Sequence, residues 1–93
     1  MTPEQEQQRG RDAQRLLEDP LLIEAFDTLE QEIMRSWKTA PARDVEGREK
    51  LWMMLHLLQK ARNHLESVMQ SGKLAEATLA QRARRALGRG ASL

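Results

Sequence analysis

The sequence predicts an all-α protein: a helical hairpin of two main antiparallel helices, with an additional helix at each end, forming a small bundle. Leu, Ala, Glu, Gln and Arg dominate and β-branched residues are scarce, which favours helix. Two stretches also place apolar residues at helical spacing. The chain has 93 residues and no cysteine, so its core must be thin and free of disulfides. Extra stability must then come from helix packing or from a partner.

The first helix is expected over residues 2–18. Thr2 can cap it, Pro3 suits the first helical position, and Glu4 places an acid in the first turn. Gly10 lies in its middle and weakens it. Its apolar residues are few: Ala13, Leu16 and Leu17. We expect the first two turns of this polar helix to fray unless a neighbouring element holds them.

Asp19-Pro20 repeats the cap-plus-proline signature and opens the second helix. One apolar stripe follows at steps of four, three, four and four residues: Leu22, Phe26, Leu29, Ile33 and Trp37. Pro41 cannot continue a helix, so residues 38–43 are expected to form the hinge of the hairpin.

Asp44 caps a third helix, expected to run from Val45 to about residue 70, with Gly47 where a full capping box would have Glu or Gln. Its core face spans an arc of about 160°: Leu51, Met54, Leu55, Leu57, Leu58, Ala61, Leu65, Val68 and Met69. This helix would be roughly 40 Å long and the preceding one roughly 28 Å. About a third of the long face then needs another cover, either a fourth helix or another chain.

Residues 71–73 resemble a C-cap and short turn, with Gly72 in the left-handed conformation. An alanine-rich fourth helix over residues 74–87 and a flexible end over 88–93 would follow. The chain thus divides into a polar helix (1–18), a hairpin core (19–71) and a basic C-terminal region (72–93). Residues 1–71 carry ten Lys/Arg and thirteen Asp/Glu, a net charge of −3, whereas residues 72–93 carry five and one, a net of +4.

The long helix carries the candidate interface residues. Trp52 lies about 100° from Leu51 and off the core face, where it either covers the edge of the core or anchors an interface. Arg62 falls inside the apolar arc, so it must reach solvent or pair with a carboxylate such as Asp27 or Glu30, or with a second subunit or a ligand. The other candidates for association are Trp37, Leu55, Leu58 and Leu65.

No catalytic, metal or cofactor site is predicted. His56 and His64 are eight residues apart and differ by about 80° in bearing, so one helix cannot bring both to one metal ion. The carboxylates are spread over polar faces, and no glycine-rich phosphate loop occurs. These observations favour a protein that is not an enzyme.

Four arginines near the C-terminus form the second candidate contact: Arg82, Arg84, Arg85 and Arg89. They suffice for a modest, salt-sensitive affinity for phosphates. No aromatic residues lie among them and no helix-turn-helix is recognisable, so a solvated face or an acidic protein partner is the competing interpretation. A membrane is disfavoured, because the apolar side of this helix is mostly alanine.

Helix caps and core positions of residues 16–75 resemble small uncharacterised helical proteins of tailed bacteriophages and prophages. The resemblance is carried by the stretch from Asp19 to Phe26, Trp37, the stretch from Asp44 to Trp52, residues 65–68 and residues 72–74. It implies a phage-encoded accessory or virion-associated protein, found in the bacterial cytoplasm or in the virion.

The leading hypothesis is a non-enzymatic helical protein that self-associates through its long helix and contributes to virion assembly or genome packaging. One alternative is a small phage effector that inhibits a host protein by binding it. Another is a DNA-binding accessory that uses the C-terminal arginines. Partners are expected to be a second copy, another phage or host protein, or nucleic acid, without a membrane.

Overall fold

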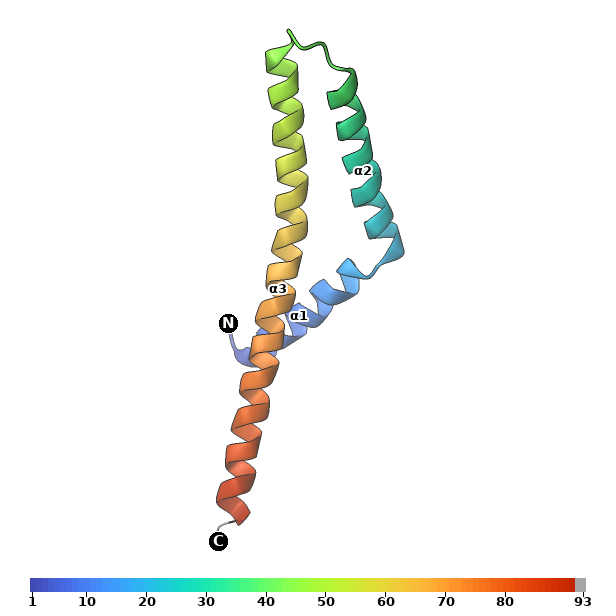
Figure 1. Ribbon diagram of the computed structural model, residues 1–93. Helices are drawn as coiled ribbons and strands as arrows, with labels where there is room; N and C mark the ends of the chain where they lie inside the picture. The colour runs from blue at the N-terminus through green and yellow to red at the C-terminus, as the bar shows by residue number, and fades with distance from the viewer. Residues whose placement is uncertain (92–93) are drawn as a thin grey trace.

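Three helices make up the protein in the computed structural model, which describes the backbone of residues 1–91 and the side chains of residues 1–88. They are α1 (Pro3–Leu17), α2 (Pro20–Thr39) and α3 (Val45–Ala91). The prediction of an all-α protein is confirmed. α2 and α3 run antiparallel side by side, and α1 crosses α3 below them, so that the lower part of α3 extends alone (Figure 1).

Each helix begins where the sequence supplies a cap. Thr2 and Gln5 form a complete capping box, with each side chain bonded to the other residue's backbone N–H. The Asp19 carboxylate accepts hydrogen bonds from the N–H groups of Leu21 at 2.8 Å and Leu22 at 3.2 Å. Asp44 accepts from the N–H of Gly47 at 3.1 Å. The predicted starts of the first three helices are therefore confirmed.

Replacing Asp19 with alanine is expected to destabilise the protein by about 1 kcal/mol, because two N–H groups at the start of α2 lose their acceptor. Urea unfolding followed by circular dichroism, at one fixed protein concentration, measures the loss. Asp19→Asn is the control, since an asparagine side chain still offers an acceptor and should keep most of the stability. Equal loss in both variants would show that the cap itself contributes little.

The predicted break at residues 71–73 is wrong. α3 is one continuous helix of 47 residues that passes through Gly72, and no described residue has a positive φ. A separate fourth helix over 74–87 therefore does not exist. The expected flexible end over 88–93 falls on α3 as far as Ala91, and its last two residues lie outside the described chain.

Gly72 serves a close helix crossing instead of a turn. A Cβ atom added at Gly72 would lie 2.6 Å from the Cα of Gly10, and one added at Gly10 would lie 2.6 Å from the Cα of Gly72. A Cβ atom added at Gly10 would also press on the backbone carbonyl oxygen of Val68, and one added at Gly72 on that of Glu6. Side chains are excluded from this point, because non-bonded carbon atoms normally lie about 3.5–4.0 Å apart.

Small residues continue the crossing one turn further along each helix. Ala13 is 3% exposed and Ala75 is 4% exposed, and both follow their glycine by three residues. The backbones of α1 and α3 therefore approach through a Gly-x-x-Ala pattern on each helix. The first two turns of the polar α1 were expected to fray unless a neighbouring element held them. α3 is that element.

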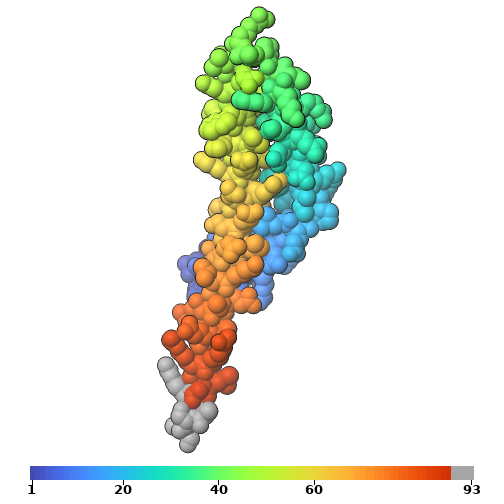
Figure 2. Space-filling model, in the orientation of Figure 1, coloured from blue at the N-terminus to red at the C-terminus, as the bar shows by residue number. Residues whose placement is uncertain are grey.

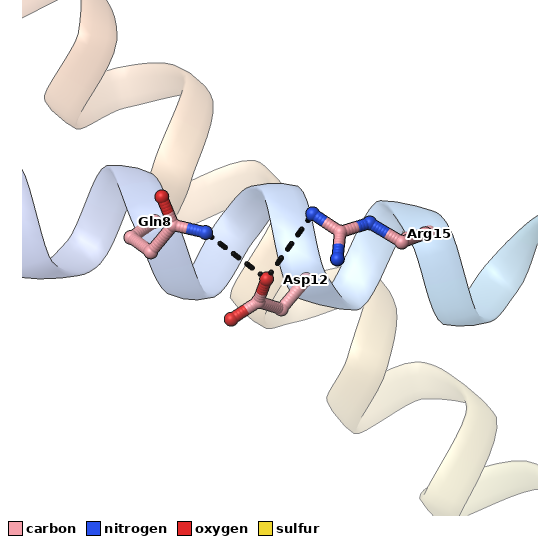
Figure 3. Close-up of polar contacts among 3 residues, drawn as sticks. All are labelled: Gln8, Asp12 and Arg15. Carbon is pink, nitrogen blue, oxygen red and sulfur yellow. Dashed lines mark hydrogen bonds and ion pairs between the residues drawn. The ribbon is translucent and has the colours of Figure 1, made fainter.

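The outer side of α1 is stabilised by its own polar side chains. Asp12 accepts a hydrogen bond from the Gln8 side chain at 3.1 Å and pairs with Arg15 at 3.5 Å (Figure 3). Such neighbours at one helical turn contribute about 0.2–0.5 kcal/mol each, and exposure to water keeps the ion pair weak. They favour the helix without providing a core.

α2 lies against the upper half of α3 through a short row of contacts. Ile33 is 8% exposed and is the one large apolar side chain that is buried among the described residues. Near the hinge, the Arg48 guanidinium covers the ring of Trp37 at 4.1 Å. At the other end, Arg62 pairs with Asp27 at 3.6 Å and lies 5.2 Å from the centre of the Phe26 ring. The expected pairing of Arg62 with a carboxylate on the facing helix is observed.

The molecule is long and has almost no interior. Its principal extents are 77 × 24 × 17 Å, and its radius of gyration is 20.9 Å, compared with about 12 Å for a compact domain of this length. Its accessible surface is 7433 Å², whereas a folded monomer of this mass exposes about 5,500 Å². One chain therefore leaves uncovered much of the apolar surface that a stable domain would bury.

Candidate functional site

An apolar groove lies between α2 and α3 in the upper half of the molecule. Leu57 projects beside it and is 65% exposed, with Met54 next to it on α3 and Leu29 across from it on α2. The groove has a volume of about 510 Å³, and Glu32 is its one charged residue. We call it the Leu57 groove. Its remaining lining residues are Ile33, Ser36, Leu51 and Leu58.

The Leu57 groove continues the side of α3 that α1 covers lower down. Eighteen residues make five turns of an α-helix, so Met54 lies directly above Gly72 and Leu57 directly above Ala75. Along one stripe, glycine and alanine are buried under α1, whereas methionine and leucine five turns away have no cover. Within one chain, α1 therefore covers the lower part of this stripe and leaves the upper part exposed.

A second apolar surface lies on the other side of the α2–α3 pair, and we call it the Trp52 surface. Trp52 is 54% exposed, and its ring stacks on His56 with 4.2 Å between the ring centroids. Met34, Trp37 and Leu55 line the hollow beside it, and Val45 extends it toward the hinge. Arg48 covers part of Trp37, so a cation already occupies that aromatic face.

The six predicted interface residues do not share one surface. Leu58 lines the Leu57 groove, whereas Trp52, Trp37 and Leu55 lie at the Trp52 surface. Arg62 is engaged by Asp27 at the lower end of the α2–α3 pair. Leu65, also on α3, is half-buried.

Sequence reasoning left out the residues that dominate the Leu57 groove. Leu29, Met54 and Leu57 had been placed on core stripes, yet all three are exposed. A signal for this was present, because the core arc of about 160° on the long helix is wider than one neighbouring helix can cover. The Gly10–Gly72 crossing had a signal too, in the matching Gly-x-x-Ala spacing of two distant segments.

The lower part of α3 lies beyond the α1 crossing (Figure 2). Its sequence contains the C-terminal arginines. We call residues 81–91 the arm. All side chains of residues 81–88 are exposed, including those of Arg82, Arg84 and Arg85. The side chain of Arg89, the fourth predicted contact, lies outside the described residues.

A third cavity, of about 580 Å³, lies at the corner where α1 leads into α2 and both face α3. Leu16, Leu22 and Met69 contribute apolar walls, while Arg62 and Glu66 bring charge to its rim. Arg62 already pairs with Asp27, so this cavity offers no cation dedicated to a ligand.

Within the described residues, no helix is both long and apolar enough to cross a membrane. The same part of the chain brings together no three His, Cys, Asp or Glu side chains that could hold a metal ion. No known protein family, no curated protein and no solved structure matches this chain.

Proposed function

We propose that this protein is a non-enzymatic helical interaction protein whose second copy fills the Leu57 groove. Following the resemblance of residues 16–75 to tailed-phage proteins, we further propose that the assembly contributes to virion assembly or genome packaging. The observation that carries the self-association is the pair of exposed side chains, Met54 and Leu57, on the same stripe that α1 covers lower down.

The exposed area supports a second copy as the occupant. The chain's surface exceeds that of a compact monomer of its mass by about 1,900 Å². A stable protein–protein interface covers about 800 Å² on each partner, so less than half of this excess would suffice. A second copy is present whenever the protein is made, so it is always available to cover the exposed apolar surface.

The shape of the groove also suits a two-fold pair. Leu57 projects beside a hollow floored by Ile33 and Leu58, so each copy offers one knob and one hole. In such a pair the two α2–α3 hairpins form a four-helix bundle, with α1 and the arm as terminal additions outside it. The small bundle expected from the sequence would then be completed by two chains.

Leu57→Glu is expected to dissociate the assembly, because it would place two carboxylates in an apolar interface. Light scattering should show a concentration-stable oligomer for the wild type and a monomer for Leu57→Glu. Leu74→Glu is the matched control: Leu74 is on the same helix and is 72% exposed, but lies outside the groove, so the oligomer should persist. A wild-type monomer at every concentration would overturn self-association.

The phage setting needs a separate measurement. Purified particles of the phage that encodes the protein should contain it if it is part of the virion. For a role in packaging alone, the protein should be absent from particles, and deleting its gene should reduce the amount of packaged DNA. Neither result would alter the conclusion from light scattering.

The Trp52 surface favours a second candidate function, that of an effector which binds and inhibits a host protein. An exposed tryptophan beside a shallow hollow is typical of an energetic anchor in an interface. A host protein that is captured by the wild type and lost with Trp52→Ala, while the oligomer persists, would support this function. Loss of the oligomer with Trp52→Ala would instead place the self-interface on that side.

A further inference from the structure

We propose that the arm binds duplex DNA through its phosphates, without reading the sequence. The arm lies past the α1 crossing (Figure 1), and all of its described side chains are exposed. It contains no acidic residue, since the last one in the chain is Glu76. This inference goes beyond self-association and does not depend on it.

The arginines are not needed for holding the chain together. The described ion pairs join Arg15 to Asp12 and Arg62 to Asp27, and neither involves the arm. Basic side chains stabilise the C-terminal end of a helix by interacting with the helix dipole, but only when they lie within about its last turn. Arg82, Arg84 and Arg85 lie more than one turn before Ala91, where α3 ends in the described chain. A helix-dipole role therefore does not account for them.

The arrangement of charge around the helix fits the major groove. At 100° per residue, Arg82 and Arg84 point about 160° apart, so a helix in the groove presents one arginine toward each bordering strand. Arg85 adds a second cation near the flank of Arg82. An α-helix with its side chains is about 10–12 Å across, close to the width of about 12 Å of the major groove.

The side of the arm between Arg82 and Arg84, away from Arg85, carries Ala83, Ala86 and Leu87. Ala83 points about 100° from both Arg82 and Arg84, and its small side chain would let the helix approach the base edges, with Leu87 about 40° from it. The arm has no aromatic residues to stack on unpaired bases. Its one residue of the type that reads adenine, Gln81, points about 160° away from Ala83. Duplex DNA bound by charge and shape is thus favoured over single strands, and competition by an acidic polymer tests an acidic protein partner.

Fluorescence anisotropy with a short labelled duplex of mixed sequence tests the proposal on the full chain. Three phosphate contacts predict a slope of about −2.7 in the logarithm of affinity against that of salt, or about a 40-fold loss between roughly 50 and 200 mM salt. The triple change Arg82→Gln, Arg84→Gln and Arg85→Gln should flatten this slope. The corresponding lysine variants should keep it, since lysine retains the charge.

The matched control changes three exposed arginines of α1 to glutamine: Arg9, Arg11 and Arg15. It removes the same charge and should leave the slope unchanged. Leu57→Glu also keeps the arm and should still bind DNA, which separates this inference from self-association. No binding by the wild type, or the same slope in the arm variant as in the control, would overturn it. Displacement of the duplex by polyglutamate of equal charge would overturn it in favour of an acidic protein partner.

Discussion

Replacing Gly72 with leucine is expected to detach α1 from α3 and remove about one fifth of the helical signal. α1 contributes 15 helical residues, compared with 20 in α2 and 47 in α3. A side chain at Gly72 would start 2.6 Å from the Cα of Gly10, so the two backbones must separate. Once detached, α1 is marginal, because an isolated helix of about 12–15 residues is barely stable in water. Circular dichroism measures the loss of helix, and limited proteolysis locates it in α1.

Gly88→Leu is the control for this experiment. A Cβ atom added at Gly88 meets nothing within 4 Å, so the substitution should only raise the helix propensity of α3. That gain is about 0.8 kcal/mol and is common to both variants, so the difference between them isolates the crossing. The crossing would be contradicted if Gly72→Leu kept its full helical signal and a protease-resistant α1.

The midpoint of thermal unfolding is expected to rise with protein concentration, by about 4 °C for each tenfold increase for a dimer that unfolds as it dissociates. The physical reason is that the described part of one chain buries only Ala13, Ile33 and Ala75 among its apolar side chains. Because one chain buries so little, most of the free energy that stabilises the folded protein should come from association. Differential scanning calorimetry at two concentrations measures the shift.

Leu57→Glu should lose this concentration dependence and unfold at a lower temperature than the dilute wild type. Leu74→Glu should keep it, because Leu74 lies outside the Leu57 groove although it is similarly exposed. If the wild-type midpoint did not move with concentration, the three helices of one chain would be stable without a partner. The exposed Met54 and Leu57 would then need an occupant other than a second copy.

Local sequence signals were reliable for the starts of the helices. Thr2, Asp19 and Asp44 were expected to act as caps, and each side chain accepts a backbone hydrogen bond. A cap requires only residues within one turn of each other, so the sequence contains all the atoms that decide it. The same reasoning holds for Pro41, since a proline interrupts a helix whatever surrounds it.

The signal at Gly72 was misleading because two physical roles of glycine compete. Glycine often ends a helix in the left-handed conformation, and it also allows two helices to touch. Ser71 and Lys73 on either side do not distinguish these roles. The deciding atom is the Cα of Gly10, which lies 62 positions away in the sequence.

The candidate interaction surfaces were predicted only in part. An exposed Trp52 follows from its bearing on the helix, and its 54% exposure agrees with that expectation. The separation of Leu58 from Trp52 and Trp37 onto two sides of the α2–α3 pair could not be predicted, because it depends on which part of the apolar arc α2 covers.

The sequence by itself determined that this protein is all-α, where its helices begin, and that its positive charge gathers at the C-terminal end. Those properties depend on composition, caps and periodicity, which act within a few residues. Only the tertiary structure decided that α3 is continuous, that α1 covers the stripe around Gly72 and Ala75, and that Met54 and Leu57 on the same stripe stay open. Which side of a helix is covered depends on contacts between segments far apart in the chain, and periodicity identifies an apolar side without identifying what covers it.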